Sequence, residues 1–202
     1  MGIPVLILGE SGSGKSASMR NFKENEIGII NVGKKPLPFK SSIKPFNSDN
    51  YCQIEEVLKK AKAKSIVIDD AQYLMANEFM RTAKTNGYQK FTDIALNFWT
   101  LVKIVVDELP EDKIVYFLGH IERDNNGNEK FKTIGKMLDE KITIEGLFTI
   151  VLKTLVKDGS YQFTTQTNGQ DTVKSPIGMF ESPTIDNDLK LVDETIRKYY
   201  EI

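Results

Sequence analysis

The chain has 202 residues, of which 40% are hydrophobic and 27% are charged. This composition excludes the disordered class, and the length fits one domain over residues 1–202. The formal net charge of −1 excludes attraction of the whole protein to nucleic acid or membrane, so a polyanion contact needs a local basic patch. The apolar segment over residues 1–8 is too short to span a bilayer and carries no basic residues. We therefore expect a cytoplasmic protein.

Short β-rich runs alternate with longer helical patterns, which predicts an α/β fold with a mainly parallel sheet and crossover helices. Residues 3–8 form a continuous apolar run, typical of a central strand. In the first half of the chain we expect a helix from about Lys15 to Glu24, a strand over 27–32, an irregular loop over 33–50, a helix over 53–62 and a strand over 65–69.

The second half of the chain continues the alternation and predicts three layers, a C-terminal antiparallel β extension and a terminal helix. The expected elements are a helix over 88–108, a strand within 113–121, a hairpin turn at 124–128, a strand over 148–152, an antiparallel strand over 161–165 and a helix over 189–200.

A glycine-rich loop follows the first expected strand and has the spacing Gly-x-x-x-x-Gly-Lys-Ser, which predicts a P-loop. The loop alone fits ATP or GTP, and of these we expect ATP and its product ADP. Its glycines allow the backbone to approach phosphates, and its N–H groups attract anions. We expect Lys15 to bridge the β- and γ-phosphates and Ser16 to bind Mg²⁺. The expected nucleotide contacts are Gly9, Glu10, Ser11, Gly12, Ser13, Gly14, Lys15, Ser16 and Ala17. The alternative is a glycine-rich turn that only caps a helix.

Two acidic residues end the expected strand over residues 65–69. Asp69 is placed to hold Mg²⁺, through water, beside the P-loop. Asp70 would face the γ-phosphate and orient or deprotonate the attacking water. The alternative for Asp70 is a helix N-cap ahead of residues 71–74.

His120, the single histidine, ends the expected fourth strand, and ligand-facing groups lie at the carboxyl ends of strands in α/β sheets. We therefore expect it to sense the γ-phosphate or the attacking water. The predicted catalytic set is Lys15, Asp70 and His120, although a lone histidine at a strand end can also be purely structural.

The glycine-rich loop, residues 67–70 and Gly119-His120 resemble RecA-like P-loop ATPases, and residues 133–148 resemble small phage-encoded, RecA-like ATP-binding proteins of single-strand annealing and recombination. The resemblance implies a RecA-like sheet, ATP-controlled binding of single-stranded DNA, and oligomers as the working form. If the protein is phage-encoded, the expected location is the cytoplasm of a host cell. It also suggests that Lys132, Lys136 or Lys141 reaches a neighbour's ATP, with a solvated lysine-rich hairpin as the alternative. One departure is that residues 33–36 carry no acid where such recombinases keep a catalytic glutamate.

Two basic segments that carry aromatic residues are candidates for single-stranded DNA contact, since lysine meets phosphates and rings stack on bases. The first contains Lys34, Lys35, Phe39, Lys40, Lys44 and Phe46, and the second contains Arg81, Lys84, Gly87, Tyr88 and Lys90. The alternative for each segment is an ordinary solvated face.

The sequence thus favours a slow or DNA-stimulated ATPase that acts on single-stranded DNA in recombination or repair. One alternative is a P-loop nucleotide or small-molecule kinase, although only four arginines are present for a phosphate-binding lid. The other is a non-hydrolysing ATP switch that recruits a partner.

Overall fold

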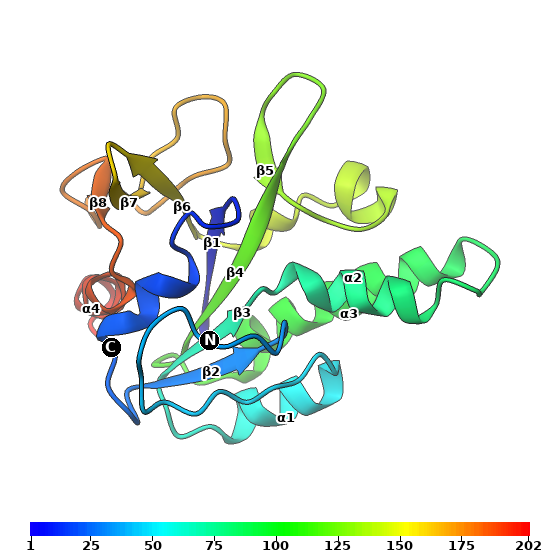
Figure 1. Cartoon of the computed structure of the whole chain (residues 1–202), viewed down its shortest axis with the longest axis horizontal. Helices are drawn as coiled ribbons and strands as arrows, with labels where there is room; N and C mark the ends of the chain where they lie inside the picture. Colours follow the sequence, from blue (N-terminus) through cyan, green and yellow to red (C-terminus); the bar gives the residue numbers. More distant parts are fainter.

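The computed structural model describes residues 1–202, apart from the side chains of Asp139 and Glu140. An eight-stranded sheet has the order β2-β3-β4-β1-β6-β7-β8, with β5 paired to the end of β4 (Figure 1). The strands are β1 (Ile3–Gly9), β2 (Ile27–Asn31), β3 (Ser65–Asp69), β4 (Ile114–Arg123), β5 (Glu129–Phe131), β6 (Ile150–Lys157), β7 (Ser160–Thr164) and β8 (Thr184–Asp186). The helices are α1 (Tyr51–Lys60), α2 (Gln72–Arg81), α3 (Gln89–Glu108), α4 (Leu189–Tyr200), the 3₁₀ turns η1 (Ser16–Asn21) and η3 (Ile144–Leu147), and the π turn η2 (Met137–Lys141).

The sheet is mixed but mostly parallel. Strands β2, β3, β4, β1 and β6 pair in parallel, and β7 and β8 extend the β6 edge in antiparallel fashion. The predicted α/β class, antiparallel extension and terminal helix are therefore confirmed.

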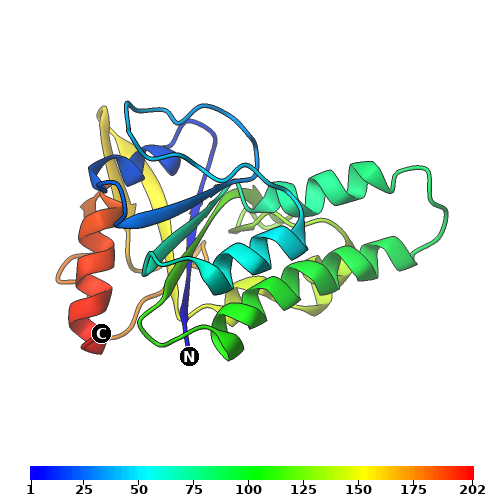
Figure 2. The same cartoon turned by 90° about the horizontal axis from the view of Figure 1, so that it is seen from below.

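Helices cover both faces of the sheet (Figures 1 and 2). On one face, α1, α2 and α3 bury residues such as Leu58, Leu74 and Phe98 against the strands. On the other, η1 and α4 bury Met19 and Val192. The continuous apolar runs of β1, β3 and β4 are explained by this double cover, because a strand buried on both faces has no solvent side.

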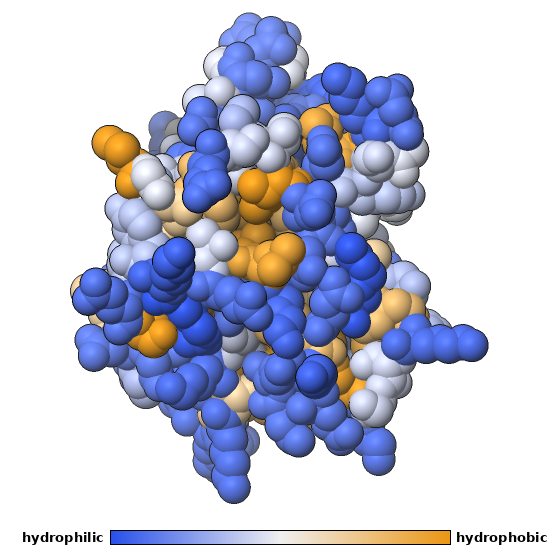
Figure 3. Space-filling view, turned by 90° about the vertical axis from the view of Figure 1, so that its left-hand side faces the viewer, coloured by the Kyte–Doolittle hydropathy of each residue, from blue (hydrophilic) through white to orange (hydrophobic). Residues whose placement is uncertain are grey.

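Helix α4 is amphipathic and forms part of the face shown in Figure 3, which is mostly hydrophilic with a limited hydrophobic area near its centre. Its inner side carries a buried polar contact as well as apolar residues. One oxygen of Asp193 accepts hydrogen bonds from Ser65 Oγ at 2.7 Å and Tyr116 OH at 2.8 Å, and the other accepts from Arg197 Nε at 2.8 Å. This network ties the helix to β3 and β4.

The predicted helix after the glycine-rich loop is wrong in type and length. Residues 16–21 form a 3₁₀ turn, and Phe22 is already extended. Two polar side chains explain the early end: Ser18 Oγ donates to the Lys15 carbonyl at 2.6 Å, and Asn21 Nδ2 donates to Asp188 at 2.6 Å. Such side chains compete with regular helix hydrogen bonds.

Other boundaries agree closely with the sequence. The strand over 65–69 and the helix over 189–200 have the predicted bounds, and α1 begins two residues earlier than expected. The sequence indicates α2 only through the alternative that Asp70 caps a helix beginning at residues 71–74. It does not predict β8. Among the described residues, none of the helices has the length and hydrophobicity needed to cross a membrane.

Candidate functional site

The glycine-rich loop (residues 9–16) leaves the carboxyl end of β1 and enters η1. Gly9 lies where a Cβ would clash with the Thr154 hydroxyl of the neighbouring strand β6. Gly14 has φ +98°, and a Cβ there would lie 2.8 Å from the Tyr161 ring. Both positions need glycine, one for space and one for backbone conformation. The loop is therefore packed tightly against β6 and β7.

Lys15 is almost fully buried beneath this loop, with 6% of its surface exposed. Its Nζ donates to the carbonyl oxygens of Gly9 at 2.9 Å and Glu10 at 2.7 Å. Burial lowers the pKa of Lys15 to about 8, although the nearby Asp70 and Asp69 oppose the shift. The ammonium group thus remains mostly protonated at neutral pH although it is buried.

Ser16 and Asp69, the two predicted metal ligands, are in direct contact although 53 positions separate them. Ser16 Oγ donates to Asp69 Oδ1 at 2.8 Å. Burial raises the pKa of Asp69 to about 6, against the opposing effect of this hydrogen bond. A cation at this carboxylate would relieve that burial cost.

Oxygen donors of this kind fit Mg²⁺, which in nucleotide sites takes one or two protein ligands and fills the rest of its shell with phosphate and water. Among the described residues, no group of three or more His, Cys, Asp or Glu side chains could hold a metal alone. Ser16 and Asp69 are therefore the described residues that could contribute ligands to Mg²⁺ here.

Asp70 lies between two nitrogen-bearing side chains. Its Oδ2 accepts from Lys35 Nζ at 3.0 Å, and its Oδ1 is 3.6 Å from His120 Nε2. The imidazole and then the ammonium group lower the pKa of Asp70 to about 2, against the effect of burial. The residue has φ +61°, and α2 has Ala71 as its N-cap without a side-chain cap hydrogen bond. The N-cap alternative for Asp70 is therefore wrong.

His120 lies near the end of β4, in register with Gly9 of β1. Strand β4 runs between β1 and β3, so the imidazole lies between the glycine-rich loop and the acidic strand end. Its backbone N–H donates to Gln72 Oε1 at 3.3 Å, and its ring makes an edge contact with Tyr73 at 6.2 Å between centroids. The histidine is thus held in place by the start of α2.

A cavity of about 680 Å³ joins these groups. The anticipated residues that line it are Ser11, Gly12, Gly14, Lys15, Ser16, Ala17, Asp69, Asp70 and His120. The remaining lining residues, not foreseen as part of this site, are Arg20, Asn31, Lys35, Pro36, Pro38, Tyr161 and Asn187. The structure therefore brings the predicted catalytic and metal residues to one cavity.

Three predicted loop contacts do not line that cavity. Gly9 faces Thr154, and the Ser13 hydroxyl is 2.6 Å from the Thr154 hydroxyl. The Glu10 carboxylate pairs with Arg123 at 3.1 Å on the exposed side. Their backbones still shape the loop, and the Glu10 and Gly9 carbonyls bind the lysine.

One of the unforeseen lining residues, Asn31, could have been predicted from the sequence. Asn31 ends an apolar strand and follows the same strand-end rule that identified Asp69 and His120. Tyr161 and Asn187 had no such signal, because they come from the C-terminal extension. Asn187 is 2% exposed, and its Nδ2 is buried without a hydrogen-bond partner among the described residues.

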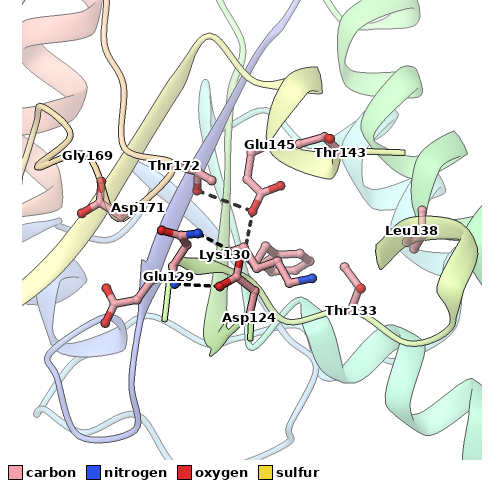
Figure 4. Close-up of a pocket in the computed structure, with 12 residues that line it drawn as sticks. Asp124, Glu129, Lys130, Thr133, Leu138, Thr143, Glu145, Gly169, Asp171 and Thr172 are labelled. Atoms are coloured by element: carbon pink, nitrogen blue, oxygen red, sulfur yellow. Dashed lines mark hydrogen bonds between the residues drawn. The ribbon is translucent and has the colours of Figure 1, made fainter. Parts of the chain in front are cut away.

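The lysines suggested for contacts between subunits lie elsewhere. Lys132, Lys136 and Lys141 are exposed, and none lines the cavity beside the glycine-rich loop. The stretch over residues 133–148 instead borders a second cavity of about 370 Å³ (Figure 4). There the buried Glu145 accepts a hydrogen bond from the Phe131 backbone at 2.6 Å. The predicted contacts between subunits remain predictions.

The two basic segments are adjacent in the fold. Asp49 accepts from Lys34 Nζ at 3.2 Å and from Arg81 Nη1 at 2.7 Å, so it joins the loop after β2 to the end of α2. Tyr88 is 89% exposed in the turn between α2 and α3, which projects away from the sheet (Figure 2). Phe39 is partly buried against the core and offers less surface for stacking than its sequence context suggests.

No model of a known protein family matches this chain, and no curated protein is significantly similar to it.

Proposed function

We propose that this protein is a P-loop ATPase with a RecA-like core that binds ATP with Mg²⁺ and hydrolyses it slowly. The observation that carries the proposal is the 2.8 Å contact of Ser16 with Asp69 beside the buried Lys15. A hydroxyl, a carboxylate and an ammonium group converge on one cavity large enough for a nucleotide. A glycine-rich turn that only capped a helix would not require this convergence.

Each residue of the site would have a separate role in ATP binding and hydrolysis. Backbone N–H groups of residues 11–16 and the Lys15 ammonium would bind the phosphates, and Ser16 and Asp69 would hold Mg²⁺. Bound Mg²⁺ would neutralise phosphate charge. Asp70, a weak base because of its low pKa, is better suited to orient the attacking water than to deprotonate it. His120 would contact that water or the γ-phosphate.

The reaction is the transfer of the terminal phosphoryl group to water. The water oxygen forms a bond to the γ-phosphorus, and the bond from that phosphorus to the bridging oxygen breaks, leaving its electron pair on ADP. The water protons remain with phosphate or pass to solvent. No further reactant is needed.

Binding of a fluorescent ATP analogue tests the proposal directly. We expect Mg²⁺-dependent binding by the wild type and its loss in Lys15→Ala, because the phosphates then lack their buried cation. Lys23→Ala, an exposed lysine just after η1, is the control and should bind like the wild type. Absence of Mg²⁺-dependent ATP binding by the folded wild type would overturn the proposal.

We further propose single-stranded DNA as the partner, because Asp49 brings both basic segments to one surface next to the nucleotide cavity. Phosphates on that surface would compete with Asp49 for Lys34 and Arg81. The test is fluorescence anisotropy of a labelled oligonucleotide at low salt, with and without ATP. Lys40→Ala with Lys84→Ala should weaken binding, and Lys157→Ala should not. No binding in any nucleotide state would refute this partner.

The two alternatives predict different products. A kinase would release ADP only with an added phosphoryl acceptor, whereas the ATPase releases phosphate into water. A switch would bind ATP tightly without phosphate release, even with DNA present. The low basicity of Asp70 is the one observation that favours the switch over the ATPase. Phosphate release measured with and without oligonucleotide separates these cases.

A further inference from the structure

The loop after β2 presents one lysine to the nucleotide cavity in a fixed position. Asn31, at the end of β2, is 5% exposed, and its Nδ2 donates to the Lys35 carbonyl oxygen at 2.7 Å. The same asparagine pairs in register with Asp69 of β3. The backbone of Lys35 is therefore anchored to the strand pair that carries the predicted metal ligand.

The side chain of Lys35 is also held. Its Nζ is 3.0 Å from Asp70 Oδ2 and 5.1 Å from the centroid of the Tyr73 ring. A Cβ on Gly33 would lie 3.1 Å from Asp70 Oδ2, so this glycine leaves room for the ion pair. The ammonium group has three N–H donors, and Asp70 accepts only one of them. Donors remain for a second anion.

The charged residues that line the cavity indicate which anion the remaining N–H donors of Lys35 would bind. Asp69 and Asp70 place two carboxylates beside the expected phosphates, and the cationic residues that line the same cavity are Lys15, Arg20 and Lys35. A terminal phosphate next to an unpaired Asp70 would meet like charge, which is unfavourable at close range. Lys35 lines the same cavity and neutralises Asp70, so it makes this end of the cavity acceptable to a phosphate.

We propose that Lys35 binds the terminal phosphoryl group of a nucleoside triphosphate within the same subunit, and so distinguishes a triphosphate from a diphosphate. The inference rests on the proposed function. The family resemblance suggests that a lysine from a neighbouring subunit contacts the ATP. The inference assigns this cationic contact to Lys35 of the same chain instead. It also gives a role to a basic residue at the place where the recombinases that the sequence resembles carry an acid, since Lys35 would act on the phosphate and not on the water.

The neighbouring lysine provides a matched control. Lys34 has a similarly exposed side chain, at 56% against 63% for Lys35, but it pairs with Asp49 and does not line the nucleotide cavity. A general effect of positive charge on this loop would appear in both variants. A specific phosphate contact would appear only at Lys35.

The experiment measures the affinities of a non-hydrolysable ATP analogue and of ADP, each with Mg²⁺, for the wild type, Lys35→Met and Lys34→Met. Methionine keeps an unbranched apolar side chain at this position and removes the charge. Loss of one charge-assisted hydrogen bond predicts about a 10- to 100-fold weaker analogue affinity for Lys35→Met. Its ADP affinity should be unchanged. With no DNA in the assay, Lys34→Met should match the wild type for both ligands, because Lys34 is assigned only to the DNA surface.

Three outcomes would overturn the inference while leaving the proposed function standing: equal losses for ADP and the analogue, equal effects at both lysines, or no effect at Lys35. Lys35→Arg, which restores the charge, should recover part of the analogue affinity. Urea unfolding of each variant checks that the fold is retained. Mixing Lys35→Met with the wild type should lower phosphate release in proportion to the mutant fraction, and a steeper fall would assign the contact to a neighbouring subunit instead.

Discussion

Replacing Asp69 by asparagine tests the stability of the fold separately from the proposed nucleotide binding. The carboxylate is 7% exposed and accepts a hydrogen bond from Ser16. Asparagine has nearly the same shape, and its side-chain oxygen can accept the same hydrogen bond. The substitution therefore removes the buried negative charge and little else.

The size of the effect follows from the pKa of Asp69, which burial raises from 3.8 to about 6. Because the folded protein binds this proton more tightly than the unfolded chain, the carboxyl's contribution to stability is largest below pH 3.8 and is lost as the pH rises through 6. Ionisation of Asp69 lowers the free energy of unfolding by about 3 kcal/mol at pH 7.5 and by about half as much at pH 5. Asp69→Asn should raise the free energy of unfolding by these amounts.

Urea unfolding at the two pH values, without nucleotide, measures this gain as a difference between variant and wild type. The contributions of ionisable groups that do not interact with Asp69 cancel in that difference. Mg²⁺ and ATP should stabilise the wild type by mass action but not the variant, because a ligand of the metal is missing. The variant is thus expected to be more stable and inactive.

The control is Asp93→Asn, which changes an exposed carboxylate of α3 and should leave the stability unchanged at both pH values. The reasoning would be refuted if Asp69→Asn were no more stable than the wild type at pH 7.5. A gain that did not shrink at pH 5 would show that the effect does not come from ionisation.

Other substitutions test the site and its support. Gly9→Ala should cost about 1–3 kcal/mol through overpacking against Thr154, and Thr154→Ala in the same chain should relieve part of it, as a double-mutant cycle by urea unfolding would show. Gly146→Ala, which meets open space, should be nearly neutral. Asp70→Asn should keep ATP binding but slow phosphate release by about 10- to 100-fold, and a wild-type rate would exclude Asp70 from catalysis. Asp193→Ala removes the acceptor of hydrogen bonds from three side chains. It should destabilise the protein by about 3 kcal/mol or more, which would be seen as a lower unfolding midpoint.

Local sequence rules predicted the parts of the site that depend on chain neighbours. The glycine-rich loop has a fixed spacing, and Asp69 and His120 each follow an apolar strand. Parallel strands present their carboxyl ends at one sheet edge, so these residues had to lie near each other. The helix after the loop was predicted incorrectly, in part because Asn21 donates a hydrogen bond to Asp188, a partner so distant in the chain that a local pattern does not reveal it.

By itself the sequence determined the strands of the parallel part of the sheet, the spacing of the glycine-rich loop and the carboxyl edge at which the candidate site would form, since these depend on local spacing and burial. Only the tertiary structure decided what surrounds Asp70. Lys35 comes from the loop after β2 and His120 from β4, and their contacts with one carboxylate depend on how three strand ends are arranged in space. That arrangement turns a predicted general base into an ion-paired group, and it brings a loop lysine to the place expected for the terminal phosphate.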